Sequence, residues 1–288
     1  MANHSSPHRN DRQSRGVTTV VICYNQVETI AQALTSVASQ EIDFEHRIII
    51  GDDGSTDGTR EVCSSFAQRV GGSVTLLPLE ANLGVGLNLV RVLMRVETPF
   101  VAICEGDDFW TDPKKLQRQC DALAAKPEAS LCFTDNVDRF ETSGEENTLQ
   151  WSRMGIPEEF GLPFLLRRDW FIRTPTMVWR SEVHDLLPSY YHELYSTDYF
   201  LQITAARHGK IIRIDGPPSA VYRHGAGVSR AGMLKQTWRD VHYLHRLPGI
   251  VVHNFSTELL RAATVHAARH LGSAFRHALR SIWERNNG

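Results

Sequence analysis

The sequence predicts an α/β fold, a mostly parallel sheet covered by helices. The first observation is that apolar, β-branched runs of strand length alternate with amphipathic helical segments over residues 17–104. The second is that polar turn residues follow each of these runs. With 288 residues, the chain is long enough for one large domain or two small ones with a substantial core.

The first third of the chain repeats strand and helix in strict order. VTTVVIC at 17–23 is a β-branched run, and apolar residues at helical spacing follow it up to Ala38. GDDGSTDGT then forms a turn cluster rich in residues that cap helices. The expected strands are 17–23, 47–50, 73–78 and 99–104, and the helices between them end near residues 38, 70 and 95.

The pattern is less regular after residue 110. A helix should begin through Asp112 and Pro113 and end before Pro127. SLCFTDNVDRF at 130–140 is expected as one strand, and residues 141–170 as loop with short helices. The remaining expectations are a return to the sheet at 174–180, a helix and strand over 196–214 separated at Gly209, and a mainly helical segment over the last 55 or so residues.

Composition narrows the classes of function. The net charge of −2 and near-neutral pI argue against nucleic acid as a partner. Five cysteines without a CxxC pair indicate reduced thiols. No run approaches the roughly 18 apolar residues of a membrane span, and residues 1–16 form a polar tail without the apolar region of a signal peptide. We therefore expect a cytoplasmic protein.

Polar and acidic side chains follow each expected strand at its carboxyl end. Because the carboxyl ends of parallel strands lie at one edge of a sheet, these side chains should share one crevice, where ligands bind in such folds. The residues concerned are Tyr24, Asn25, Asp52, Asp53, Asn82, Glu105, Asp107 and Asp108.

So many carboxylates without a matching cluster of Lys or Arg would repel one another. A hard divalent cation, Mn²⁺ or Mg²⁺, would relieve that repulsion, with the phosphates of a nucleoside diphosphate completing its coordination. Two common nucleotide-binding plans are excluded, because YNQVET follows the first strand in place of G-x-G-x-x-G and no P-loop motif occurs.

Five segments, in this order and spacing, resemble the family 2 glycosyltransferases with the GT-A fold, a Rossmann-like architecture. They are VVICYNQVETIAQALTSVASQ, IIIGDDGSTDGT, ANLGVGLNLVRVL, FVAICEGDDFWTDPKKLQRQ and SLCFTDNV. The resemblance is strong over 17–140 and weaker to about 229. It implies a catalytic domain over 17–230, divided into a nucleotide-binding half (17–110) and an acceptor half (111–230). The mainly helical segment 231–288 carries no signature of the family and is expected to be a C-terminal extension.

The resemblance implies inverting transfer of a sugar from a nucleoside diphosphate sugar to an acceptor hydroxyl. Asp108 would be the main metal ligand and Asp198 the general base. His224 would reach the metal or the phosphates, although Tyr222-Arg223-His224 is one residue shorter than the Y-R-x-H of related sequences. The remaining donor-binding candidates are Tyr24, Asn25, Glu28, Asp52, Asp53, Asn82, Gly84, Glu105, Asp107 and Arg223. Leu87 stands where the family often has an Arg that contacts the nucleotide.

Several alternatives stay open at this stage. Asp52 and Asp53 could shape a turn, and Asp198 could cap a helix. Trp151, Trp170 and Trp179 could stack on an acceptor sugar or lie in the core. The C-terminal helices could pack on the catalytic domain or on a second subunit, or lie peripherally on the inner membrane face.

UDP-sugar is the default donor, and the acceptor is expected to be a glycan or a lipid-linked sugar, as in bacterial surface glycan synthesis. A non-catalytic nucleotide-sugar binder is the main alternative. A sugar nucleotidyltransferase is a weaker one, because it needs a Gly-rich, Arg- and Lys-bearing loop after the first strand that CYNQVET does not provide.

Overall fold

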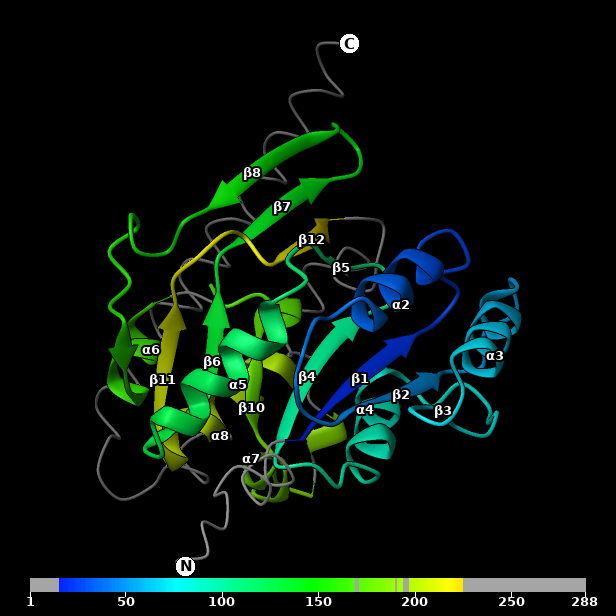
Figure 1. Ribbon diagram of the computed structural model, residues 1–288, viewed down its shortest axis with the longest axis horizontal. Coiled ribbons are helices and arrows are strands. Elements are labelled where there is room, and N and C mark those ends of the chain that lie inside the picture. Colours follow the sequence, from blue (N-terminus) through cyan, green and yellow to red (C-terminus); the bar gives the residue numbers. More distant parts are fainter. Residues whose placement is uncertain (1–15, 169–170, 190, 194–196, 225–288) are drawn as a thin grey trace, which may run out of the picture.

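The computed structural model describes residues 16–168, 171–189, 191–193 and 197–224, and Figure 1 shows their arrangement. An eight-stranded sheet in the order β3-β2-β1-β4-β10-β6-β11-β9 forms the centre of the described chain. Its strands are β1 (Val17–Cys23), β2 (His46–Asp52), β3 (Val74–Leu76), β4 (Phe100–Glu105), β6 (Ala129–Thr134), β9 (Glu159–Phe160), β10 (Val178–Arg180) and β11 (Lys210–Ile214).

Strand pairing in this sheet is mostly parallel, as the sequence predicts. β1 pairs in parallel with β2 and β4, and β2 pairs in parallel with β3. β10 lies antiparallel between β4 and β6, and β9 lies antiparallel to β11. The carboxyl ends of β1, β2 and β4 therefore meet at one edge, where the predicted polar residues follow them.

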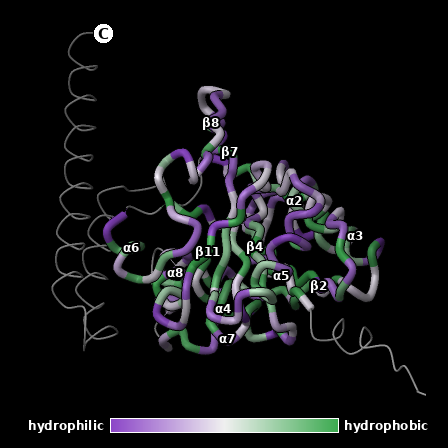
Figure 2. Tube along the Cα trace, turned by 60° about the vertical axis from the view of Figure 1, so that its left-hand side comes forward, coloured by the Kyte–Doolittle hydropathy of each residue, from purple (hydrophilic) through white to green (hydrophobic). Residues whose placement is uncertain are grey.

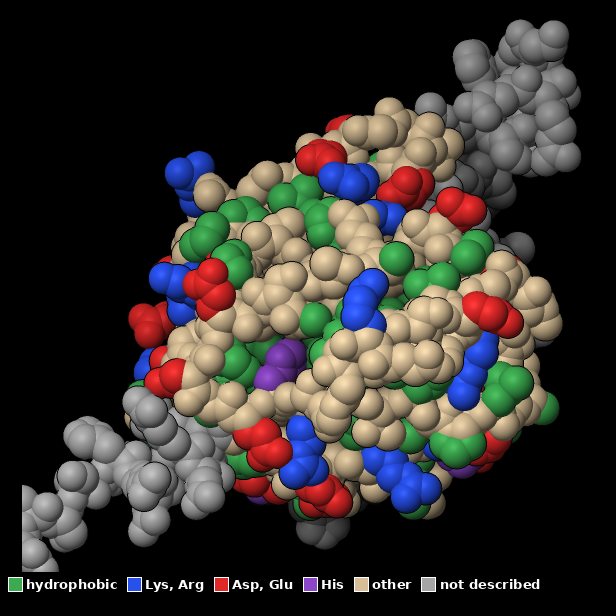
Figure 3. Space-filling view, turned by 45° about the vertical axis from the view of Figure 1, so that its right-hand side comes forward, with side chains coloured by type: hydrophobic (Ala, Val, Ile, Leu, Met, Phe, Trp, Pro, Cys, Tyr) green, Lys and Arg blue, Asp and Glu red, His purple; other side chains and the backbone are tan. Residues whose placement is uncertain are grey.

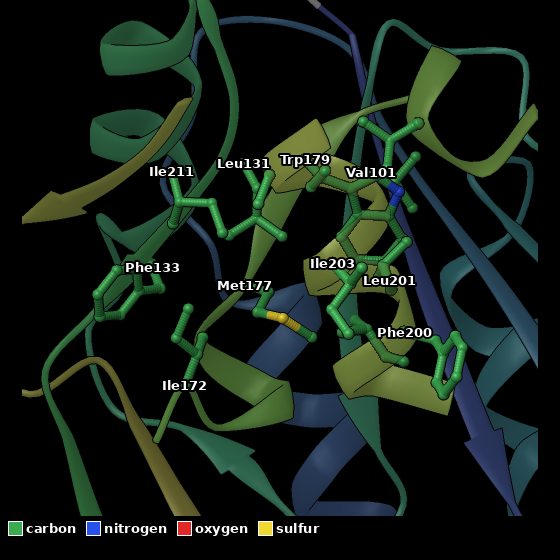
Figure 4. Close-up of a cluster of buried hydrophobic side chains, with 14 of the residues drawn as sticks. Val101, Leu131, Phe133, Ile172, Met177, Trp179, Phe200, Leu201, Ile203 and Ile211 are labelled. Atoms are coloured by element: carbon green, nitrogen blue, oxygen red, sulfur yellow. The ribbon is translucent and has the colours of Figure 1, made fainter. Parts of the chain in front are cut away.

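Helices cover both faces of the sheet, and β1 shows why. Side chains alternate between the faces of a strand, so Val20 and Ile22 enter one apolar cluster while Val21 and Cys23 enter another. The first cluster also contains residues of α4 (Val85–Leu93), α6 (Leu162–Arg167), α7 (Glu182–Asp185) and α8 (Thr197–His208), and Figure 4 shows part of it around Trp179. The second contains residues of α2 (Ile30–Ala38), α3 (Thr59–Val70) and α5 (Lys115–Ala125). Among the described residues there are also the 3₁₀ turns η1 (Thr174–Thr176) and η2 (Tyr191–Glu193).

The prediction of one strand over 130–140 is wrong, because this segment contributes to two sheets. β6 ends at Thr134 in the large sheet, and β7 (Asn136–Phe140) begins a second sheet. Asp135 lies between them, buried, with its carboxylate accepting the backbone N–H of Trp151 at 2.9 Å. That bond holds the chain at the point where it changes direction.

The second sheet has four strands in the order β5-β12-β7-β8, with β5 (Phe109–Trp110), β8 (Glu145–Leu149) and β12 (Ala220–His224). Residues 141–170 were expected to be loop with short helices, which is wrong for the two-residue strand β9 and for β8. Its side chains are mostly polar and exposed, so it lacks the apolar alternation that identifies a half-buried strand. The hairpin of β7 and β8 projects from the rest of the described chain (Figure 2).

The two sheets meet where the site is expected. Figure 1 shows the carboxyl end of β4 directed toward β5 and β12, with the carboxyl end of β1 beside it. β5 pairs with β12 through Trp110 and Ala220, so the segment EGDDFW bridges from the large sheet into the small one. On the face in Figure 3, acidic and basic side chains are interspersed and hydrophobic side chains form small groups. None of the helices in the described ranges has the length and apolar character needed to cross a membrane.

Candidate functional site

Three carboxylates converge at the end of β4. One oxygen from each of Glu105, Asp107 and Asp108 lies within 4.8 Å of the others, the distance at which a single metal ion can be shared. Burial raises the pKa of all three, and the mutual repulsion of Glu105, Asp107 and Asp108 raises those of Glu105 and Asp108 further. A cation in this place would reverse that effect.

Asp108 is the most enclosed of the three. Its Oδ1 accepts the backbone N–H of Arg223 from β12 at 2.8 Å, which anchors the carboxylate to the small sheet. Its Oδ2 is buried and has no hydrogen-bond partner among the residues that the structure describes. A buried carboxylate oxygen without a partner is costly, so Oδ2 is suited to a metal ligand.

Glycine is required at the centre of the acidic segment. A Cβ on Gly106 would collide with Oε1 of Gln26 and lie 2.8 Å from Cβ of Cys23. The backbone approaches closely because Gly106 donates its N–H to Ile22 O at 2.9 Å and accepts the hydroxyl of Thr29 at 2.8 Å. These bonds place Asp107 and Asp108 beside the end of β1.

Asp198 lies in the first turn of α8, close enough to the acidic segment for its charge to raise the pKa of Glu105. Its Oδ1 accepts the N–H of Tyr199 at 2.8 Å and its Oδ2 accepts the hydroxyl of Thr174 at 3.1 Å. Burial raises the pKa of Asp198 to about 6, and these two bonds and the charge of Arg173 offset part of the effect. The carboxylate is therefore a base of near-neutral strength, as general bases often are.

The structure adds side chains that the sequence pattern did not single out. Arg173 binds Asp138 through Nε at 3.1 Å and Nη2 at 2.6 Å, and its guanidinium lies 5.3 Å from the centre of the Tyr222 ring. Burial is the main cause that raises the pKa of Tyr222, and the charges of Glu105, Asp108 and Asp198 raise it further. The Tyr222 ring therefore lies near these three carboxylates. Arg173 and Asp138 are 35 residues apart, so no local sequence pattern predicts that they form a pair.

His224 lies outside the group of three carboxylates. Its Nε2 is 3.0 Å from Oδ2 of Asp138, and its ring stacks on Phe140 with centroids 4.4 Å apart. Burial opposes ionisation of Asp138, but the bonds to Arg173 and the contact with His224 prevail and lower its pKa. The guanidinium of Arg223 reaches Gln32 and lies over Phe109. Ligation of a metal by His224 stays a prediction.

Asp52 and Asp53 are engaged in local structure. Asp52 is fully buried and accepts the N–H and hydroxyl of Ser55, while Asp53 accepts the N–H groups of Leu83 and Gly84 at 2.8 and 2.9 Å. These contacts agree with the alternative that Asp52 and Asp53 shape a turn. Asp53 also holds the loop ANLGVG beside β2. Their contact with a nucleoside stays a prediction.

The other donor-side candidates line the same edge. Asn25 has φ of 50° and bonds to Ser55 and Thr56, so it braces the turn after β2. Asn82 accepts the N–H of Gly84 at 3.2 Å. Tyr24 and Glu28 are exposed, and so is Leu87 on α4. Trp151 and Trp179 are buried in the core, so neither is placed to stack on an acceptor, and Trp170 lies outside the described residues.

Comparison with known sequences identifies the family. The model of glycosyl transferase family 2 matches residues 18–185. An uncharacterized protein of Mycobacterium tuberculosis is 32% identical over 213 residues, which cover 73% of this chain and 59% of that protein. The dTDP-rhamnosyl transferase RfbG of Shigella flexneri is 22% identical over 238 residues, covering 75% and 79% of the two chains. The chain thus spans about 59% of the length of its mycobacterial relative.

Solved structures agree on the fold. Residues 1–349 of TarS from S. aureus superpose with a TM-score of 0.66 at 16% identity, covering 87% of this chain and 71% of that one. The mannosyltransferase PcManGT of Pyrobaculum calidifontis, solved with GDP-Man and Mn²⁺, gives a TM-score of 0.60 at 18% identity and covers 95% and 80%. These likenesses confirm the predicted GT-A fold. The family match over more than half of the sequence shows that the chain belongs to glycosyl transferase family 2.

Proposed function

We propose that the protein is an inverting, metal-assisted glycosyltransferase that moves a sugar from a nucleoside diphosphate sugar to an acceptor hydroxyl. The observation that carries the proposal is the pairing of two acidic features at one sheet edge. One is the group Glu105, Asp107 and Asp108, with a buried oxygen lacking a partner. The other is Asp198, a half-buried carboxylate whose pKa is raised to about 6.

The residues present fit a divalent cation. Carboxylate oxygens are the ligands that Mn²⁺ and Mg²⁺ prefer, and within the described ranges Oδ2 of Asp108 has no hydrogen bond that would compete with a metal. Asp108 would hold the ion, with Asp107 and Glu105 beside it and the donor phosphates completing the shell. When bound, the ion supplies positive charge that stabilises the departing diphosphate.

Asp198 would accept the proton of the acceptor hydroxyl. With a pKa of about 6, its carboxylate is mostly ionised at neutral pH yet basic enough to take a proton. A base on the side of the sugar away from the diphosphate favours a single displacement, which inverts the anomeric carbon. Tyr222 and Arg173, packed between Asp138 and the acids, would restrict water around this carboxylate.

The donor and acceptor are proposed by class. UDP-sugar remains the default donor; related folds are solved with UDP-GlcNAc and with GDP-Man, and RfbG is named for dTDP-rhamnose. Relatives are named for teichuronic acid and amylovoran biosynthesis, which supports a surface glycan or its lipid-linked precursor as acceptor. The predicted roles of the C-terminal extension in docking, oligomer formation or peripheral membrane contact concern residues 231–288, outside the described residues.

Release of nucleoside diphosphate tests the proposal. The purified 288-residue chain is incubated with Mn²⁺, a panel of UDP-, GDP- and dTDP-sugars and a panel of glycan and lipid-linked sugar acceptors, and release of nucleoside diphosphate from each donor is followed. Asp198→Asn should lower kcat by about 10²- to 10⁴-fold while donor affinity is retained. Asp185→Asn is the control, because Asp185 is 77% exposed on α7. If the wild type binds a donor and never turns it over, the protein is the non-catalytic binder instead.

A further inference from the structure

The carboxylate of Asp198 is held by a hydroxyl that the proposed reaction does not otherwise use. Thr174 donates to Oδ2 at 3.1 Å, while the N–H of Tyr199 donates to Oδ1 at 2.8 Å. With a donor on each oxygen, the carboxylate group has a defined plane and direction. We infer that Thr174 is a positioning residue that orients Asp198 toward the acceptor. The inference rests on the proposed role of Asp198 as general base.

Thr174 is itself fixed, because it begins the 3₁₀ turn η1. The carbonyl of Arg173 accepts both the N–H and the hydroxyl of Thr176, at 3.0 and 2.7 Å. The N–H of Met177 donates to Thr174 O at 3.2 Å, and Pro175 restricts the backbone in the middle of the turn. Thr174 and Thr176 are both buried, so water has little access to the hydrogen bonds of this turn.

The turn is fastened to the segment that carries the acidic group. Trp110, two residues after Asp108, donates its indole N–H to Pro175 O at 2.9 Å. Gln119 of α5 donates to Thr176 O at 2.8 Å. The same stretch of chain therefore presents the carboxylates for the metal and supports the turn that holds Asp198. This arrangement sets the separation between the leaving-group side and the base side of the site.

The opposite end of the turn is tied to the small sheet. Arg173 makes two bonds to Asp138 of β7 and lies over Tyr222 of β12. Asp138 is 4% exposed, so this ion pair is well shielded from water. Held by β5 on one side and by β7 and β12 on the other, Thr174 has little freedom to leave Asp198.

Replacement of the hydroxyl by a methyl group tests the inference. Thr174→Val keeps the shape of the side chain and removes the bond to Asp198, and we expect kcat to fall about tenfold with the KM for the donor unchanged. Thr174→Ser restores the hydroxyl and should recover most of the rate. Thr204→Val is the matched control, because Thr204 lies further along α8 and its buried hydroxyl donates to Phe200 O at 2.9 Å, away from Asp198. Thr174→Ala is a second variant without the hydroxyl, in case valine disturbs folding.

The pH profile separates positioning from a general structural effect. Four groups influence Asp198 or are influenced by it: Glu105 of β4, Arg173 before η1, Tyr191 of η2 and Tyr222 of β12. Loss of the Thr174 donor removes a bond that favours the ionised carboxylate, so the acid limb of kcat/KM should move to higher pH in Thr174→Val and return in Thr174→Ser.

The positioning role of Thr174 and the proposed function predict different outcomes and can be refuted separately. Wild-type rate and pH profile in both Thr174→Val and Thr174→Ala, with Asp198→Asn inactive, would overturn the role of Thr174 alone. A slow Thr174→Val that Thr174→Ser does not rescue would also overturn it. Full activity in Asp198→Asn would instead overturn the proposed function itself.

Discussion

Asp198→Asn should make the protein more stable at neutral pH while it removes activity. In the folded chain burial raises the pKa of this carboxyl from 3.8 to about 6. An acid whose pKa is higher in the folded than in the unfolded state opposes folding once it ionises. The wild type therefore loses stability as the pH rises from about 4 to about 6, and the neutral amide avoids that loss.

The magnitude follows from the two pKa values. A difference of one between the folded and unfolded pKa corresponds to about 1.4 kcal/mol, so the interval from 3.8 to about 6 gives at most about 3 kcal/mol. The side chain is only half-buried, and solvent screens part of the effect, so we expect about 2 kcal/mol at pH 7.5. An amide can still accept one of the bonds from Tyr199 and Thr174.

Urea denaturation of the metal-free wild type, Asp198→Asn and Asp185→Asn measures this gain. At pH 7.5 Asp198→Asn should have the higher free energy of unfolding, and at pH 4.5 the difference should be roughly a third as large, because most of the ionisation in the folded state lies above that pH. Asp185→Asn should follow the wild type at both pH values. A loss of stability in Asp198→Asn, or a gain that does not change with pH, would refute the reasoning.

Three further predictions concern the acidic segment. Gly106→Ala should lower the free energy of unfolding by about 1–3 kcal/mol in urea denaturation, because its Cβ has no space; Gly72→Ala, with nothing within 4 Å of its Cβ, should have little effect. Trp110→Phe should cost about 1 kcal/mol more than Trp179→Phe in the same assay, because only Trp110 has a hydrogen bond to lose from its indole N–H; equal losses would contradict this. The affinity for Mn²⁺, measured by calorimetry, should be lower at pH 6 than at pH 8, because the raised pKa values of Asp108 and its neighbours let protons compete more strongly with the metal as the pH falls; equal affinities would count against the metal site.

The sequence predicted the large sheet well because its strands carry strong local signals. VTTVVIC and RIII are apolar, and each is followed by turn residues, so β1 and β2 lie close to the predicted ranges. The convergence of the acidic residues at one edge follows from parallel topology alone. That rule predicted that Asp52 and Asp53, which lie at the end of β2, share an edge with the acidic segment at the end of β4, and the strand pairing agrees.

The small sheet and the support of Asp198 could not be predicted in this way. β8 is a polar, exposed strand stabilised by pairing with β7, and β5 has only two residues. The bonds from Thr174 to Asp198 and from Trp110 to Pro175 join residues 24 and 65 positions apart. Such contacts depend on how β5, η1 and α8 pack together, which local pattern does not encode. The same holds for Arg173 and Asp138.

Thermal denaturation with nucleoside diphosphates tests the central claim most directly. UDP, GDP and dTDP are added with and without Mn²⁺ to the wild type, Asp108→Asn and Asp185→Asn. Ligand binding to the folded state raises its melting temperature. We predict that at least one nucleotide stabilises the wild type and Asp185→Asn only when Mn²⁺ is present, and that Asp108→Asn shows no such rise. Stabilisation that survives in Asp108→Asn, or that no nucleotide produces in the wild type with Mn²⁺, would contradict the claim.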